Sequence, residues 1–218
     1  MVRTVLFDLD GTLADTAPDL ANALNAVLVA NGRAPLPFEA IRPAVSHGGM
    51  ALIRLGFGLE PDHPEFESLR RQLLDHYAAH IADETQLFPG MERVLGALEA
   101  DGRNWGVVTN KPGWLTEPLL DKLDLLPRAA CVVSGDTLTQ RKPDPEPIRH
   151  ACRLAGSREA ECVYVGDAER DILAGREAGM PTLVARFGYI GPDDRPEHWG
   201  ADGLLDHPEE LLTWLDRL

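Results

Sequence analysis

Basic residues, cysteines and long apolar runs are all scarce in this sequence. Lys and Arg number 21 against 35 Asp and Glu, which gives a net charge of -14. So acidic a chain offers no basic stripe for nucleic acid or for an anionic membrane surface, and we expect neither as a partner. An anionic small molecule would need a local cation or a metal ion to offset the repulsion.

The few cysteines and the short apolar runs indicate the cellular compartment in which we expect the protein. Cys131, Cys152 and Cys162 are odd in number, and each lies in an apolar segment. Their spacings do not suit a metal site, so we expect buried thiols in a reducing cytoplasm. No apolar run approaches the length of a membrane span, and the N-terminus has no signal-peptide pattern. We therefore expect a cytoplasmic protein, monomeric or homodimeric.

Two different patterns divide the 218 residues. Residues 16–82 show apolar positions at helical spacing, such as Leu20, Leu24 and Leu28, and no convincing strand. From Phe88 onward short β-branched runs alternate with helices, which predicts a parallel sheet with right-handed crossovers. The first strand, near Val2–Leu6, precedes the helical block. We therefore predict an α/β, Rossmann-like core of residues 1–15 and 83–218 with an inserted all-helical domain, residues 16–82.

An acidic motif follows this first strand directly. Asp8 and Asp10 stand two residues apart and are followed by Gly11 and Thr12. A plain Asp-Gly turn has no need of the first aspartate, so the pair points to chemistry at the end of a strand. The pattern predicts Asp8 as a nucleophile and Asp10 as its acid/base partner.

Further polar groups follow the later strands. Thr109, Asn110 and Lys111 come after one strand, Lys142 opens the helix after the next, and Gly166-Asp167 with Asp171 follow a third. Alone, Thr109-Asn110 is equally compatible with an ordinary strand exit, and Lys142 with its neighbours would be better explained as a plain helix start. The carboxyl ends of parallel strands meet in one crevice, so together they are expected to surround Asp8 and Asp10. Glu169 and Arg170 are expected to be an exposed helical pair.

These four motifs, in this order, resemble those of the haloacid dehalogenase superfamily of phosphotransferases, and the resemblance covers the whole chain. The helical block resembles the small cap that one branch of the superfamily inserts after its first motif. Residues 10–19 and 108–112 are similar to phosphoglycolate phosphatases. Residues 105–112, 142–147 and 199–202 look closer still to N-acetylmuramic acid 6-phosphate phosphatases.

The resemblance implies a Mg²⁺-dependent phosphatase of a small phosphorylated acid, either 2-phosphoglycolate or N-acetylmuramic acid 6-phosphate. It makes Asp8 the residue that forms an aspartyl-phosphate, and Asp10 the acid and then the base. The metal ligands would be the carboxylates of Asp8 and Asp167 and the backbone carbonyl of Asp10, with Asp171 holding metal-bound water.

The resemblance also implies which groups hold the substrate. Thr109 and Lys142 would bind the non-transferring phosphate oxygens, helped by backbone amides near Leu9 and Asp10. The further substrate-binding candidates are two neighbours of Thr109 and three cap residues: Asn110, Lys111, His47, Gly48 and Arg54.

Single residues bear on which other reactions of this superfamily the protein could catalyse. Dehalogenation is disfavoured because it needs no acid at position 10, and phosphonoacetaldehyde cleavage because residues 16–82 contain no lysine. A sugar phosphomutase like β-phosphoglucomutase stays open, with Arg42 and Arg54 as its extra cap cations. A non-catalytic binding protein is the remaining alternative, but it would be expected to have lost Asp8 or another motif residue.

Overall fold

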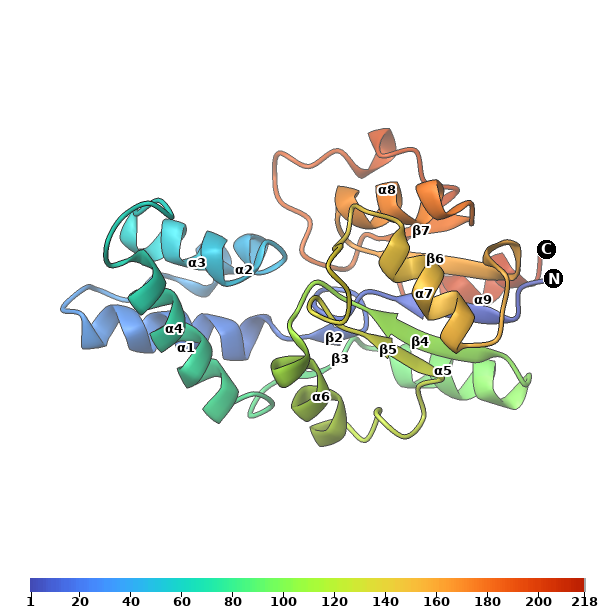
Figure 1. Ribbon diagram of the computed structural model, residues 1–218, viewed down its shortest axis with the longest axis horizontal. Helices are drawn as coiled ribbons and strands as arrows, with labels where there is room; N and C mark the ends of the chain where they lie inside the picture. The colour runs from blue at the N-terminus through green and yellow to red at the C-terminus, as the bar shows by residue number, and fades with distance from the viewer. Residues whose placement is uncertain (218) are drawn as a thin grey trace.

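A six-stranded parallel sheet forms the core of the protein, seen here in a computed structural model that describes residues 1–217 (Figure 1). The order across the sheet is β5-β4-β1-β6-β7-β8. The strands are β1 (Thr4–Phe7), β4 (Asn104–Val108), β5 (Cys131–Val133), β6 (Cys162–Gly166), β7 (Thr182–Ala185) and β8 (Gly203–Leu205). The first strand of the chain therefore lies in the middle of the sheet, with β4 and β6 on either side.

Helices cover both faces of the sheet, which explains why β1 is apolar at successive positions. Alternate side chains of β1 enter different clusters: Val5 and Phe7 pack with Val94 and Leu119, whereas Leu6 packs with Ile148. The first face is covered by α5 (Met91–Ala100), α6 (Gly113–Lys122) and α9 (Glu210–Leu215). The second is covered by α7 (Glu146–Leu154) and α8 (Glu169–Ala178).

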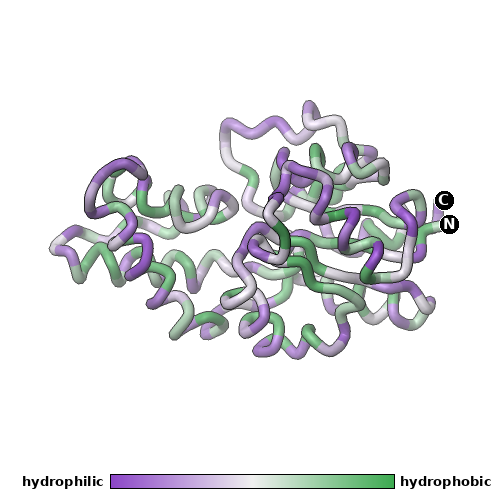
Figure 2. The backbone as a smooth tube through the Cα atoms, in the orientation of Figure 1, coloured by the Kyte–Doolittle hydropathy of each residue, from purple (hydrophilic) through white to green (hydrophobic). Residues whose placement is uncertain are grey.

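Four helices lie beyond one end of the sheet and form what we call the helical insert (Figure 1). They are α1 (Ala17–Ala30), α2 (Phe38–Val45), α3 (Gly48–Phe57) and α4 (Phe66–Ala79). Their apolar faces meet through Leu24, Leu52 and Leu73, all fully buried. Figure 2 shows the matching contrast between mostly apolar strands in the sheet and alternating polar and apolar stretches along the insert helices.

The sequence predicted the element types, and several bounds differ. The helices at 38–45, 91–100 and 169–178 begin and end where expected. The expected break in the helical pattern is present but shorter than predicted: it covers Ser46 and His47, and α3 begins at Gly48, whose φ of 73° suits glycine. The C-terminal helix begins at Glu210 rather than Pro208, and residue 218 lies outside the described residues. Within residues 1–217, no helix is long and apolar enough to cross a membrane.

A short antiparallel pair of strands, which sequence analysis did not predict, joins the insert to the core. The strands β2 (Ala14–Asp15) and β3 (Gln86–Leu87) pair where the chain leaves the core and where it returns. Beside this pair, the buried carboxylate of Asp19 accepts hydrogen bonds from the backbone N–H groups of Glu84 and Thr85 and from the Thr85 hydroxyl. The two crossings are thus tied to each other by the β2–β3 pair and by the Asp19 carboxylate.

Replacing Asp19 by Ala is expected to lower the free energy of unfolding by about 2–4 kcal/mol. The change leaves the buried N–H and hydroxyl of Thr85 and the partly buried N–H of Glu84 without an acceptor. Urea unfolding followed by circular dichroism measures the loss. Asp75→Ala on exposed α4 surface is the matched control, expected to change stability by no more than about 0.5 kcal/mol. Equal stability of the two variants would contradict a structural role for Asp19.

Candidate active site

Three neighbouring strands end in polar residues at the same edge of the sheet. Asp8 follows β1, Thr109 follows β4 and Asp167 follows β6. The Asp8 N–H still donates to the Val165 carbonyl at 2.9 Å, so the ladder between β1 and β6 extends to the motif itself. The strand order therefore brings together side chains that are far apart along the chain.

A buried acidic cluster lies at this edge. Asp8, Asp167 and Asp171 each contribute one carboxylate oxygen to a group whose members are all within 4.8 Å of one another. Asp167 Oδ2 accepts a hydrogen bond from the Tyr189 N–H at 2.9 Å, and Asp171 Oδ2 accepts one from the Ala168 N–H at 3.0 Å. Asp167 Oδ1 is buried with no hydrogen-bond partner among residues 1–217.

One buried ammonium group faces these acids. Lys142 Nζ lies 2.9 Å from Asp8 Oδ1 and 2.7 Å from Asp171 Oδ1. It also donates to the Val108 carbonyl at 2.9 Å and to the Tyr164 hydroxyl at 2.8 Å, which fix its position. Three carboxylates thus face two positive charges: Lys142, which is in contact with two of them, and Arg170, which is close enough for its charge to act on them.

The pKa values of the acids reflect this imbalance. Burial raises the pKa of Asp167 well above its usual range, and the charges of Asp171 and Asp8 raise it further. Burial also raises the pKa of Asp8, although Lys142 acts in the opposite direction. Buried carboxylates with an unsatisfied oxygen are the donor set that suits a hard divalent cation such as Mg²⁺, so the residues present fit a metal ion.

A glycine makes room for this arrangement. Gly11 has a φ of 84°, and a Cβ at this position would collide with the carboxylate of Asp167 and the ring of Tyr189. The Asp-Gly of the first motif is therefore required both for the turn and for the close approach of Asp167.

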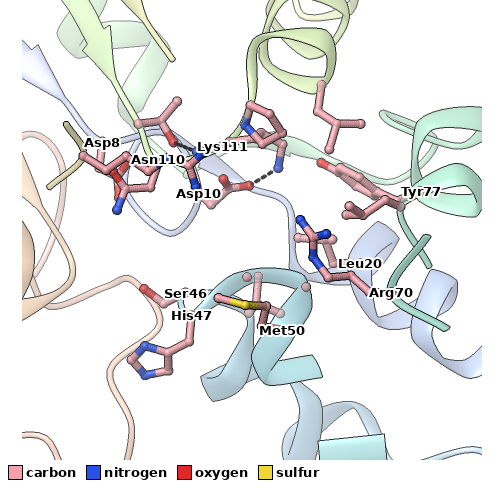
Figure 3. A pocket seen from close by; sticks show the side chains of 18 of the residues that line it. Asp8, Asp10, Leu20, Ser46, His47, Met50, Arg70, Tyr77, Asn110 and Lys111 are labelled. Carbon is pink, nitrogen blue, oxygen red and sulfur yellow. Dashed lines mark hydrogen bonds and ion pairs between the residues drawn. The ribbon is translucent and has the colours of Figure 1, made fainter. Parts of the chain in front are cut away.

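Asp10 stands apart from the cluster and faces the cavity (Figure 3). Its Oδ1 accepts hydrogen bonds from the Thr16 hydroxyl at 2.6 Å and from Lys111 Nζ at 2.7 Å. Lys111 Nζ also lies 4.6 Å from the centre of the Tyr77 ring. Burial on its own would lower the pKa of Lys111, but Asp10 and Tyr77 raise it above its usual value, so this amine stays charged.

A cavity of about 370 Å³ lies between the sheet edge and the helical insert. Figure 3 shows Asp8, Asp10, Asn110 and Lys111 on one side, with Ser46, His47 and Met50 opposite them. The insert side also contains apolar residues and one further cation: Leu20, Val45, Leu74, Tyr77 and Arg70.

The structure places most of the sequence-derived candidates around this cavity. Its lining includes Asp8, Asp10, Thr109, Asn110, Lys111, His47 and Gly48. Lys142, Asp167 and Asp171 lie behind Asp8 in the buried cluster. The Leu9 N–H donates to Asp8 Oδ1 at 2.8 Å. The amide of Asn110 is occupied by the backbone N–H and carbonyl of Lys142, which it holds in place.

The candidate cap arginines, in contrast, do not reach the cavity described here. Arg54 pairs with Glu60 at 2.8 Å on the outer surface, where its side chain is 48% exposed. The expectation that Arg54 contacts the substrate is therefore corrected: its helical face turns toward solvent. Arg42 pairs with Asp15 at 2.8 Å and lies 4.9 Å from the centre of the Tyr189 ring, beside the crossing between insert and core. The two cap cations named for the phosphomutase alternative are thus not among the residues that line the cavity.

Sequence reasoning missed Arg170, Arg70 and Tyr77. Arg170, expected to be exposed, is half-buried and lines the cavity. Its Nη2 donates to the carbonyl and hydroxyl oxygens of Ser46, at 2.7 and 3.1 Å, so the core contacts the insert here. Burial and the nearby Arg170 lower the pKa of His47, although Asp194 acts in the opposite direction. Of the pair Glu169 and Arg170, only Glu169 is exposed as expected.

This chain is similar in sequence and in fold to proteins described as phosphatases. The chain is 44% identical over 216 residues to an N-acetylmuramic acid 6-phosphate phosphatase of Pseudomonas aeruginosa, covering 99% of this chain and 96% of the relative. It is 45% identical over 209 residues to a phosphoglycolate phosphatase of Xylella fastidiosa, covering 96% and 91%. The crystal structure of a predicted phosphoglycolate phosphatase from Haemophilus somnus superposes with a TM-score of 0.87 at 26% identity, covering 98% of each chain.

The sequence profile of the haloacid dehalogenase-like hydrolases matches residues 5–185, from within β1 to the end of β7. That span contains the acidic cluster, Lys142 and the whole helical insert. The parallel sheet with an inserted set of helices agrees with the expected fold class. The chain therefore belongs to the haloacid dehalogenase-like hydrolase family.

Proposed function

We propose that this protein is a Mg²⁺-dependent phosphatase that hydrolyses a phosphorylated acid through an aspartyl-phosphate on Asp8. The observation that carries the proposal is the position of Asp8, which lines the cavity while its carboxylate contacts the buried cluster of Lys142, Asp167 and Asp171. Asp10 faces the same cavity, where an acid/base group is needed. The two named relatives above are both phosphatases, which supports the same reaction.

The metal would be held by the carboxylates of Asp8 and Asp167 and the backbone carbonyl of Asp10. Asp171 would orient a metal-bound water, although its carboxylate is close enough to Asp8 and Asp167 to be a direct ligand. When bound, Mg²⁺ neutralises charge between the acids and the phosphate dianion. The unsatisfied Asp167 Oδ1 supports this role.

The chain's own residues would then carry the reaction in two steps. In the first, Asp8 attacks phosphorus, the bond to the ester oxygen breaks, and Asp10 protonates the leaving alkoxide. In the second, Asp10 takes a proton from water as this water attacks the aspartyl-phosphate, which releases phosphate and restores Asp8. Thr109 and Lys142 would bind the non-bridging oxygens of the phosphoryl group.

Residues 16–82 would act as a cap that closes over the substrate and excludes water. The cavity lies between the insert and the sheet, and the chain crosses between them near Asp15–Thr16 and residues 82–84. Closure would bring His47 and Gly48 to the substrate, while Asn110 and Lys111 approach it from the core.

The size of the cavity favours a sugar phosphate as the substrate. About 370 Å³ is in the range that encloses a ligand of drug size, whereas 2-phosphoglycolate is a two-carbon acid. Apolar walls formed by Leu20, Val45 and Leu74 suit the bulk of a sugar ring with an acetyl group. N-acetylmuramic acid 6-phosphate is therefore the substrate we favour.

Asp8→Asn is expected to lower kcat by at least about a thousandfold, because the nucleophile is lost. The variant should unfold at the same temperature as the wild type or higher, because one of three mutually repelling buried charges is removed. Phosphate release and thermal unfolding are the measurements. Asp121→Asn, on the exposed surface of α6, is the control and should leave both unchanged. A folded Asp8→Asn protein with normal turnover would refute the nucleophile assignment.

Mg²⁺ is expected to raise the thermal unfolding midpoint by about 5–10 °C at about 100 times its dissociation constant. EDTA should remove both this shift and the activity. In Asp167→Asn the shift should be largely lost, because one of the proposed ligands is neutral. An unfolding midpoint that ignores Mg²⁺ in the wild type would take the metal out of the proposal.

A substrate panel tests the preference for a sugar phosphate. We expect kcat/KM for N-acetylmuramic acid 6-phosphate to exceed that for 2-phosphoglycolate by at least about tenfold, since the larger ligand makes more contacts with the cavity walls. The panel should include nucleoside monophosphates and other sugar 6-phosphates. A higher kcat/KM for 2-phosphoglycolate would reverse the assignment.

A further inference from the structure

Cationic side chains are concentrated around the cavity although the chain carries a net charge of -14. The lining includes Lys111, Arg70, Arg141 and Arg170, but only two carboxylates, those of Asp8 and Asp10. Such a local excess favours an anion with more charge than the transferring phosphate alone.

Two of these cations are already engaged with groups of the core or its boundary. Lys111 is bound to Asp10 at 2.7 Å, and its side chain is 7% exposed. Arg170 donates to Ser46 and stands near the carboxylates of the acidic cluster, which raise its pKa against the opposing effect of burial. Arg141 directly precedes Lys142 and is exposed, at the rim of the cavity.

Arg70 differs from the others in place and in partner. It lies on α4 of the insert, and its guanidinium group points into the cavity toward Asp10 and Lys111 (Figure 3). Its partner is Glu67, 2.7 Å away on the same helix, with a side chain that is 64% exposed. An exposed ion pair of this spacing is weak, so Arg70 can exchange it for a carboxylate inside the cavity.

We propose that Arg70 binds the carboxylate of the substrate and makes the enzyme selective for phosphorylated acids over phosphorylated sugars that lack a carboxylate. The proposal rests on the phosphatase function proposed above. Asp8 and Lys142 mark where the phosphate is bound at the sheet edge, and Arg70 projects from the opposite wall. A ligand that spans the cavity thus meets a cationic group at each end.

The chemistry of the guanidinium group suits this role. Its planar array of donors matches a carboxylate in bidentate geometry, and the hydrogen bonds are charge-assisted. Leu20, Leu74 and Tyr77 line the same cavity and offer no competing charge to Arg70.

The test compares two phosphorylated sugars that differ in the carboxylate: N-acetylmuramic acid 6-phosphate and N-acetylglucosamine 6-phosphate, which has a hydroxyl in place of the lactyl ether. Arg70→Gln is expected to lower kcat/KM about 10- to 100-fold for the first, mainly through KM, and less than about threefold for the second. Arg70→Lys should recover part of the loss. Arg71→Gln, on the exposed side of the same helix, is the matched control and should resemble the wild type.

Equal losses on both sugars, or no loss on either, would overturn the proposal. A wild-type enzyme that does not distinguish the two sugars would overturn it as well. Thermal unfolding shows whether Arg70→Gln is folded, and Arg70→Lys keeps the test available if it is not.

A binding measurement separates this proposal from the phosphatase assignment. Titration with phosphate-free N-acetylmuramic acid, followed by ligand-observed NMR, should show weaker binding to Arg70→Gln than to the wild type or Arg71→Gln. Failure of the wild type to hydrolyse any phosphate ester would refute the phosphatase function, whereas equal binding by all three proteins would refute the role of Arg70.

Discussion

The arrangement of the sheet and of the site depends on three buried carboxylates around a single ammonium group. Burying charge is costly unless it is paired, and Lys142 can pair with only part of the cluster. The sheet supports this costly arrangement: β1 lies between β4 and β6, and Lys142 is fixed by the Val108 carbonyl and the Tyr164 hydroxyl. The remaining negative charge would hold a divalent cation at the site. That cation in turn would attract a phosphate dianion to an otherwise acidic protein.

The sequence was most informative where local pattern and long-range packing agree. The apolar run of β1, buried on both faces, and the strand–helix alternation after residue 88 were sufficient to predict the sheet, and the strand ends predicted which acidic residues meet. The pair β2 and β3 escaped prediction because strands of two residues have no periodicity to detect. Their pairing depends on the insert bringing its two ends together.

Arg54 and Arg70 show why the insert side of the site was harder to predict. Both stand on amphipathic helices, and helical periodicity says only that each belongs to a polar face. Whether that face meets solvent or a cavity depends on how α3 and α4 are placed against the sheet. Arg170 escaped prediction for the same reason, because its partner, Ser46, is 124 positions away in the sequence.

Tyr189 links the acidic cluster to the start of the insert through one rigid side chain. Its backbone N–H donates to Asp167, while its hydroxyl donates to Asp15 and accepts from the N–H of Ala17, the first residue of α1. The backbone at one end and the phenol oxygen at the other are joined by an aromatic ring with little freedom to bend. The position of the Asp167 carboxylate and the start of α1 are therefore coupled through a single residue with few rotatable bonds.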